Sequence, residues 1–196
     1  MSAWSLTLAL ALALAKILKR AQSFTHRRRD WWLRFFFIVL MGGLATNAYS
    51  ATPVPSQETP SQDHSLILQI THHQHQQWLS LADIETLPLY DVELKHPEGL
   101  EGRFTGVWLN VFTAQQGIPE DTRIRLIAHD NYTIFLSHAE RKERRYFMVT
   151  RFNGLPIERQ QMGPLLLIVP ADAEGVLEGT LPLTRWIWAI REIRYQ

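Results

Sequence analysis

The sequence predicts an α+β domain that is mostly β, with a mixed sheet and two to three short helices. Three observations lead to this class. Short segments in which apolar and polar residues alternate recur along the chain, which is the pattern of strands buried on one face. Few segments show helical spacing, and each of them is short. A continuous apolar run, Pro164–Val169, has the length of a strand buried on both faces.

The strands are predicted from alternation and from the turns between them. Asp and Asn tolerate turn geometry, so we expect His129–Asn131 to join two strands, and Asn153-Gly154 is typical of a hairpin turn. The expected strands are Leu66–Ile70, Leu89–Leu94, Thr122–Ala128, Tyr132–Leu136, Arg145–Phe152, Pro164–Val169 and Trp186–Tyr195.

Short helices are expected where capping signals meet helical spacing. Ser80 and Asp83 form a capping pattern for a helix over 81–86. A second helix over 107–116 should end at Gly117, which can adopt the left-handed conformation of a helix cap. The polar stretch 137–144 predicts a helical turn. Gly99 and Gly102 indicate a loop, and the polar tract 71–78 a surface linker.

The first fifty residues differ in composition from the rest. A basic run at 25–34 precedes an apolar stretch at 35–41 and then small residues, an order typical of an export signal. We expect cleavage after Ser50; the alternative is an uncleaved anchor, although the apolar core is short of the ~20 residues that span a bilayer. The start site stays open. The predicted organisation is a leader at 1–50, a flexible linker at 51–65 and one domain at 66–196.

Charge and composition exclude several classes of function. The leader holds seven of the 20 Lys and Arg and one of the 19 Asp and Glu, which leaves the remainder with a net charge of −5. Nucleic-acid binding needs the opposite sign, because neutralising phosphates supplies most of the affinity. The chain has no cysteine, so disulfides, thiolate metal sites and cysteine catalysis are excluded.

The order of motifs in the domain resembles a known family. The motifs are Leu79–Ile84 with Leu87-Pro88, Phe104–Leu109, His129–Tyr132, Met148–Pro156, Gly163–Pro170 and Arg185-Trp186. Together they resemble the molybdopterin-binding domain of sulfite-oxidase-type oxidoreductases. The resemblance implies that fold and a pterin site to which Arg185, Trp186, His129, Asp130, Asn131 and Tyr132 would contribute. A periplasmic or other extracytoplasmic location is predicted from the export signal of the leader.

The sequence nevertheless lacks the residue that binds the metal in this family. The family's enzymes hold molybdenum through a cysteine thiolate, and the corresponding stretch here, Tyr90–Pro97, contains no sulfur. Neither Glu93 nor His96 is an equivalent soft donor. Arg185 could still bind a pterin phosphate by bidentate hydrogen bonds. We therefore expect an exported, non-catalytic accessory module that binds a small ligand or a periplasmic protein partner, with membrane contact only through an uncleaved leader.

Two alternatives remain open. The first is a divergent molybdenum-cofactor oxidoreductase that holds its cofactor through pterin contacts alone, with Arg185 on the phosphate. The second is a metal-binding protein that uses His72, His73 and His75, three histidines within four residues. On a strand, His73 and His75 would share one side and form part of a zinc, copper or nickel site.

Overall fold

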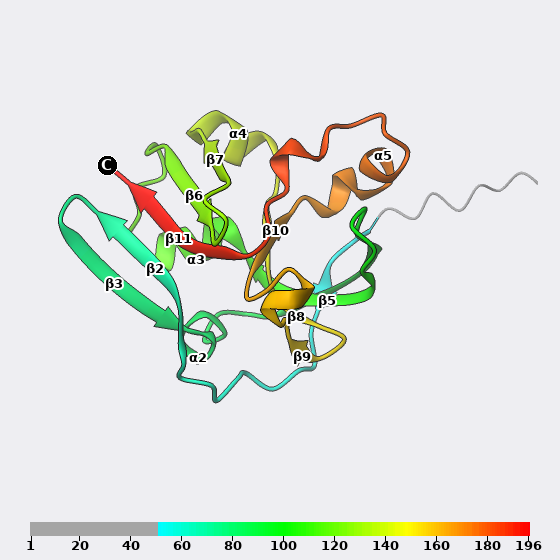
Figure 1. Ribbon diagram of the computed structural model, residues 1–196, viewed down its shortest axis with the longest axis horizontal. Helices are drawn as coiled ribbons and strands as arrows, with labels where there is room; N and C mark the ends of the chain where they lie inside the picture. The colour runs from blue at the N-terminus through cyan, green and yellow to red at the C-terminus, as the bar shows by residue number, and fades with distance from the viewer. Residues whose placement is uncertain (1–50) are drawn as a thin grey trace, which may run out of the picture. The chain divides into compact units, whose positions relative to one another are not determined.

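The structure, a computed structural model, describes residues 51–196. The predicted leader and its cleavage position after Ser50 lie outside the described residues. Within them the chain forms two β-sheets and short helices (Figure 1). This confirms the predicted α+β class with a dominant β content. The described residues hold four short α-helices, one more than the two to three expected.

The first sheet has the strand order β1-β4-β5-β8-β10, with the short β9 paired to β8. All of its pairings are antiparallel. Asn153 and Gly154 both have positive φ at the β8–β9 turn, which confirms the predicted hairpin. The strands are β1 (Val54–Pro55), β4 (Tyr90–Lys95), β5 (Glu101–Trp108), β8 (Phe147–Phe152), β9 (Leu155–Pro156) and β10 (Leu166–Ile168).

The second sheet has the order β3-β2-β11-β6-β7. The C-terminal strand β11 lies at its centre, parallel to β2 on one side and antiparallel to β6 on the other, so the predicted mixed sheet is confirmed. The predicted hairpin of β6 and β7 is present as well. The strands are β2 (Leu66–His72), β3 (His75–Ser80), β6 (Ile124–Ala128), β7 (Thr133–Leu136) and β11 (Ile190–Tyr195).

Two apolar cores share the strands β8 and β10. Met148 and Leu167 face one core, whereas Phe147, Val149 and Leu166 face the other. Successive side chains of a strand point to opposite faces, so a strand with a core on each side must be apolar at every position. This is the physical reason for the continuous apolar run that predicted β10.

α2 (Leu81–Ile84) begins with the predicted capping box of Ser80 and Asp83. α4 (His138–Glu143) lies in the predicted helical turn and begins with a second capping box, built by Ser137 and Glu140, that was not predicted. α3 (Leu109–Gln115) begins two residues later than predicted, because Val107 and Trp108 complete β5. α5 (Ala173–Leu177) was not predicted.

Three predicted segments differ from the structure. The tract 71–78 is not a linker, because it contains the end of β2, a turn at His73 and most of β3. The stretch expected as a loop at Gly102 belongs to β5, which pairs with β4 over six residues. The terminal strand begins at Ile190 rather than at Trp186, since Ala189 adopts a positive φ of 54° that breaks the extended backbone.

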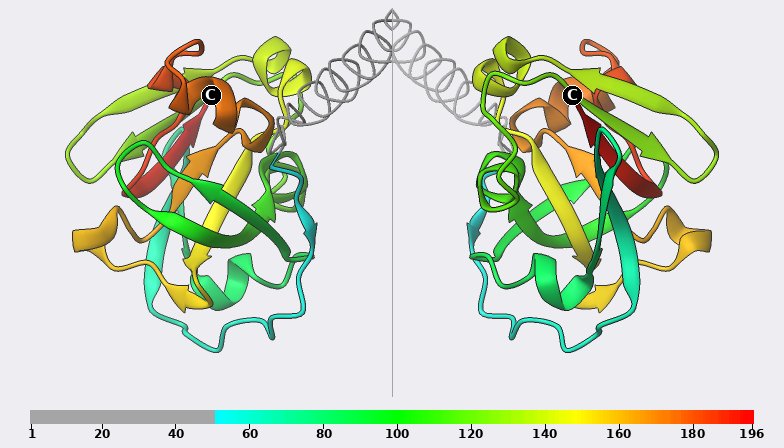
Figure 2. Two further views of the ribbon diagram at one scale, coloured as in Figure 1. Left: turned by 90° about the vertical axis from the view of Figure 1, so that its right-hand side faces the viewer. Right: turned by 90° about the vertical axis from the view of Figure 1, so that its left-hand side faces the viewer.

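The segment 51–65, expected as a flexible linker, instead lies along the domain (Figure 2). Its short strand β1 pairs with β4 of the first sheet. The Ser61 amide donates to Glu85 Oε2 at 2.7 Å, and the Thr59 carbonyl accepts from the Arg151 guanidinium at 2.9 Å. We call 51–65 the strap. The Glu58 side chain of the strap also pairs with Arg103 at 2.6 Å. The composition of this segment suggested a linker because composition does not report contacts made by backbone groups and by a single charged side chain.

Candidate functional site

The turn between β6 and β7 and the stretch before β11 enclose a pocket of about 310 Å³. We call it the tryptophan pocket. It brings together residues from two of the predicted site segments, 129–132 and 185–186, which lie more than fifty positions apart in the sequence. It is lined by Ala128, Asp130, Tyr132, Leu183, Thr184, Trp186 and Trp188.

The β6–β7 turn holds its side chains through local hydrogen bonds. The Tyr132 amide donates to Asp130 Oδ1 at 2.9 Å, and Asn131 has a positive φ of 69°, as the predicted turn chemistry requires. Arg191 of β11 donates to Asn131 Oδ1 at 2.9 Å and to the Ala128 carbonyl at 3.0 Å. The turn is therefore fixed to the sheet, while the Tyr132 ring stays 48% exposed at the pocket.

The His129 side chain does not line this pocket. Its backbone amide donates to the Ala189 carbonyl at 2.9 Å, which ties the turn to the stretch that precedes β11. Desolvation, with further contributions from Arg159 and Arg191, lowers the pKa of the His129 imidazole. His129 therefore helps to position the two walls rather than to present a cation to the pocket.

Behind the pocket lies an aromatic cluster of His96, Trp186 and Trp188. The His96 ring centroid is 5.2 Å from that of Trp186 and 5.6 Å from that of Trp188. His96 comes directly after β4, in the stretch where the resembling enzymes carry their cysteine. The sequence indicated His96 only as a poor replacement for the cysteine ligand, so this cluster was not predicted.

His96 and Trp186 are both only 1% exposed. The Glu98 amide donates to His96 Nδ1 at 3.2 Å, which places the proton of the neutral ring on Nε2. Within residues 51–196, neither His96 Nε2 nor Trp186 Nε1 has a hydrogen-bond partner. Burial lowers the pKa of His96 from 6.5 to about 4. The cluster is therefore uncharged at neutral pH and contains two N–H donors without an acceptor.

Arg185 does not contribute to the tryptophan pocket. It is absent from the residues that line the pocket, and its guanidinium acts instead on Tyr146 and Glu140. Burial raises the pKa of Tyr146, and the Arg185 charge opposes that rise. The same charge helps to lower the pKa of Glu140, after the larger effect of hydrogen bonds from Ser137. The structure thus separates Arg185 from the residues with which the resemblance grouped it.

The three candidate metal-binding histidines lie at the end of the β2–β3 hairpin. His72 and His75 are paired across the two strands. The His72 ring stacks on Tyr195 at 4.3 Å, and His73 occupies the turn with a positive φ of 52°. Among residues 51–196, no three His, Asp or Glu side chains come together in an arrangement that could hold a metal ion.

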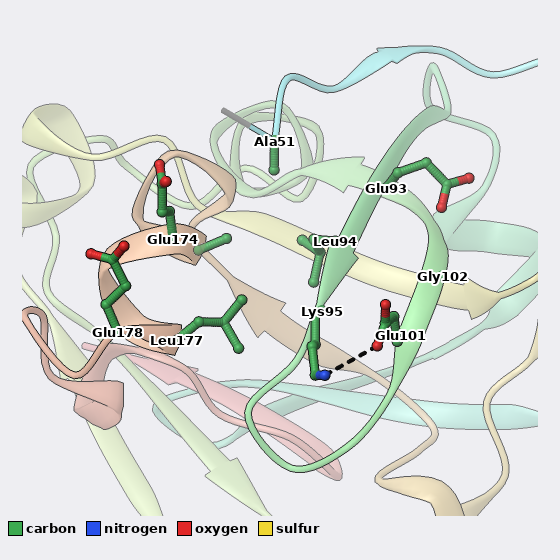
Figure 3. A pocket seen from close by; sticks show the side chains of 10 residues that line it. Ala51, Glu93, Leu94, Lys95, Glu101, Gly102, Glu174, Leu177 and Glu178 are labelled. Carbon is green, nitrogen blue, oxygen red and sulfur yellow. Dashed lines mark ion pairs between the residues drawn. The ribbon is translucent and has the colours of Figure 1, made fainter. Parts of the chain in front are cut away.

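A second concavity, of about 740 Å³, lies between α5 and the β4–β5 hairpin (Figure 3). Its floor is apolar and its rims carry four glutamates, so we call it the acidic groove. The spacing of Glu174 and Glu178 around Leu177 is the sequence signal that could have indicated it, once α5 was recognised as a helix. It is lined by Ala51, Glu93, Leu94, Lys95, Glu101, Gly102, Ala173, Glu174, Leu177 and Glu178.

No protein-family model matches this chain, and no curated protein sequence matches it. In the part of the chain that the structure describes, no helix is long and apolar enough to cross a membrane.

Proposed function

We propose that this protein is an exported, non-catalytic binding module, related in fold to the molybdopterin-binding domain of sulfite-oxidase-type oxidoreductases, that takes a small flat ligand in the tryptophan pocket. One observation carries the proposal. Two segments singled out by the motif order, 129–132 and 185–186, contribute residues to the same pocket, and three of its seven lining residues are aromatic. The basic, apolar and small-residue order of the leader supports export.

The pocket does not fit the molybdenum cofactor of the resembling enzymes. The chain has no cysteine to ligate the metal, and His96 lies packed against Trp186 with its Nδ1 occupied by the Glu98 amide. The described residues that line the pocket include one carboxylate, that of Asp130, and no lysine or arginine. A phosphate-bearing ligand would meet a like charge there without a compensating cation. We therefore favour a binding module over an oxidoreductase.

The lining favours a ligand with a flat, largely apolar body. Small-molecule sites are typically apolar and aromatic with a few polar groups that fix orientation, in cavities from about 300 Å³ upward. Tyr132 and Trp188 offer ring surfaces for stacking, and the Asp130 carboxylate and Thr184 hydroxyl offer hydrogen-bond acceptors. An uncharged heterocycle that carries N–H groups matches this combination.

The test measures binding of four probes to the purified full chain by isothermal titration calorimetry. The probes are unphosphorylated pterin, guanosine, the flavin fragment lumichrome and guanosine monophosphate. We expect saturable binding of an uncharged probe and at least about tenfold weaker binding of the monophosphate, because Asp130 repels it. Tyr132→Ala should weaken binding by about tenfold, the usual worth of one stacked ring.

Leu155→Ala is the matched control, because Leu155 is 70% exposed on β9 and does not line the pocket. It should leave the affinity unchanged. Tighter binding of guanosine monophosphate than of guanosine would contradict the proposed pocket chemistry. Stoichiometric molybdenum in protein purified after co-expression with the genes for cofactor synthesis would contradict the non-catalytic assignment.

A further inference from the structure

The acidic groove carries a large apolar side chain, Leu177, that the described residues leave uncovered. Leu177 on α5 is 43% exposed although it is a large aliphatic side chain. It faces Leu94 of β4 across the groove (Figure 3), and Leu94 itself is only 9% exposed. Leaving such apolar surface in water costs about 25 cal/mol per Å². The floor therefore offers a contact area for an apolar surface.

Carboxylates flank this floor on both sides. Glu174 and Glu178 lie on the α5 side, and Glu93 and Glu101 lie on the hairpin side (Figure 3). Lys95 is the one cation that lines the groove in the described residues, and it pairs with Glu101 at 3.2 Å. Within residues 51–196, Glu93, Glu174 and Glu178 form no ion pair. Three like charges thus surround an apolar strip without a compensating charge in the described domain.

We propose that the acidic groove docks a basic amphipathic helix of a partner protein. In this arrangement the apolar face of the helix lies on Leu94 and Leu177. Its lysines and arginines lie on either side, against Glu93 on one rim and against Glu174 and Glu178 on the other. Helix-in-groove recognition uses apolar anchors about one turn apart, and complementary charge on both rims fixes the orientation of the helix and excludes acidic competitors.

The basic cluster at 141–145 of a second copy matches the groove less well, because its three arginines are engaged within their own domain. Arg141 donates to the carbonyls of Glu120 and Thr122, and Arg144 pairs with Asp172. The guanidinium of Arg145 lies 3.9 Å above the Trp108 ring. An anionic lipid surface is also disfavoured, because the rim carboxylates would repel it.

The test uses the purified full chain and a fluorescently labelled 18-residue peptide of lysine and leucine, patterned so that a helix has one apolar and one basic face. Fluorescence anisotropy should report saturable binding that weakens as salt increases. A peptide of the same composition in scrambled order should bind at least about tenfold more weakly, because it cannot present an apolar face.

Variants of the groove separate the contribution of the rim charges to peptide binding from that of the apolar contact. Glu174→Gln with Glu178→Gln removes two rim charges from an exposed helix and should weaken binding by about tenfold. Leu177→Gln should weaken it to a similar degree at every salt concentration. Glu143→Gln, an exposed glutamate on α4 outside the groove, is the matched control and should bind as the parent does.

Three outcomes would overturn the proposal. Equal binding of the patterned and scrambled peptides would reduce the interaction to charge alone. Unchanged binding by the groove variants would place the peptide elsewhere. Self-association of the full chain that Leu177→Gln abolishes, measured by sedimentation velocity, would make a second copy the occupant. None of these results bears on the tryptophan pocket, so the proposed function stands or fails separately.

Discussion

At the scale of single residues, His96 shows how one position can be informative and still be misread. Its place after β4, where the resembling enzymes carry a cysteine, drew attention to it as a metal ligand. The structure instead gives it a buried, neutral ring between two tryptophans. A buried imidazole that cannot easily accept a proton has a measurable consequence for stability.

We predict that the free energy of unfolding increases with pH between about 4 and 6.5. Burial lowers the folded-state pKa of His96 from 6.5 to about 4, so in this range the unfolded chain binds a proton that the folded chain does not. Stability therefore falls as pH decreases through the window and is independent of His96 above it. The full effect is at most about 3 kcal/mol. Urea unfolding at a series of pH values measures it.

The control for this prediction is His96→Phe, which keeps a ring between the tryptophans and removes the titrating group. Its unfolding free energy should depend much less on pH between 5 and 6.5. His129 contributes in the same direction, because its pKa is lowered too, but it is less buried. An unchanged pH dependence in His96→Phe would refute the assignment to His96.

At the scale of elements, predictions were accurate where one local signal decides the structure. The capping box at Ser80 fixes where α2 begins, and the Asn153-Gly154 pair fixes a hairpin. β3 and β5 were missed because their sequences do not alternate. β3 is exposed from His75 to Trp78, and β5 is continuously buried from Phe104 to Trp108. Both depend on neighbouring strands that sequence patterns do not reveal.

Two glycines illustrate the same contrast between features that a local signal predicts and features that only tertiary contacts explain. Gly117 ends α3 with a φ of +68°, and a Cβ built there meets no atom within 4 Å. Gly106 lies at the irregular register between β5 and β8, where a Cβ would approach the Met148 carbonyl oxygen to 2.1 Å. The first glycine was predicted from its position after a helix. The second serves a close approach between strands, which only the tertiary structure shows.

We predict that Gly106→Ala destabilises the domain more than Gly117→Ala does. The first substitution forces backbone to move between two central strands and should cost about 3 kcal/mol. The second places alanine in a left-handed conformation without a clash and should cost about 1 kcal/mol. Urea unfolding of both variants measures the difference. Equal losses would mean that β5 and β8 separate at the bulge without penalty.

At the scale of the whole molecule, the candidate site was only partly predictable. The motif order selected 129–132 and 185–186, and the structure places Asp130, Tyr132 and Trp186 on one pocket. The motif order could not show that Arg185 interacts with Tyr146 instead of lining the pocket, because the direction of a side chain depends on packing. It could not show the acidic groove either, because its walls come from segments about eighty residues apart.

The strap is the other feature that sequence composition concealed. A buried ion pair joins it to both α2 and β8. Arg151 Nε donates to Glu85 Oε1 at 2.9 Å, and the Glu85 side chain is fully buried. Each partner also contacts the strap, Glu85 through the Ser61 amide and Arg151 through the Thr59 carbonyl. These contacts fix the path of the chain from residue 51 to the first long strand.

We predict that Arg151→Met destabilises the whole domain and loosens the strap. Removing one partner leaves the Glu85 carboxylate buried without its cation, which typically costs about 3 to 5 kcal/mol. Urea unfolding should show that loss, and amide hydrogen exchange should increase across 58–63. The double variant Arg151→Met with Glu85→Met should recover much of the stability, because no buried charge remains. Its strap should still exchange faster than that of the parent, since the bonds to Thr59 and Ser61 are absent. Parental exchange rates in both variants would show that the other contacts of the strap, β1 and the Glu58–Arg103 ion pair among them, hold it without the buried pair.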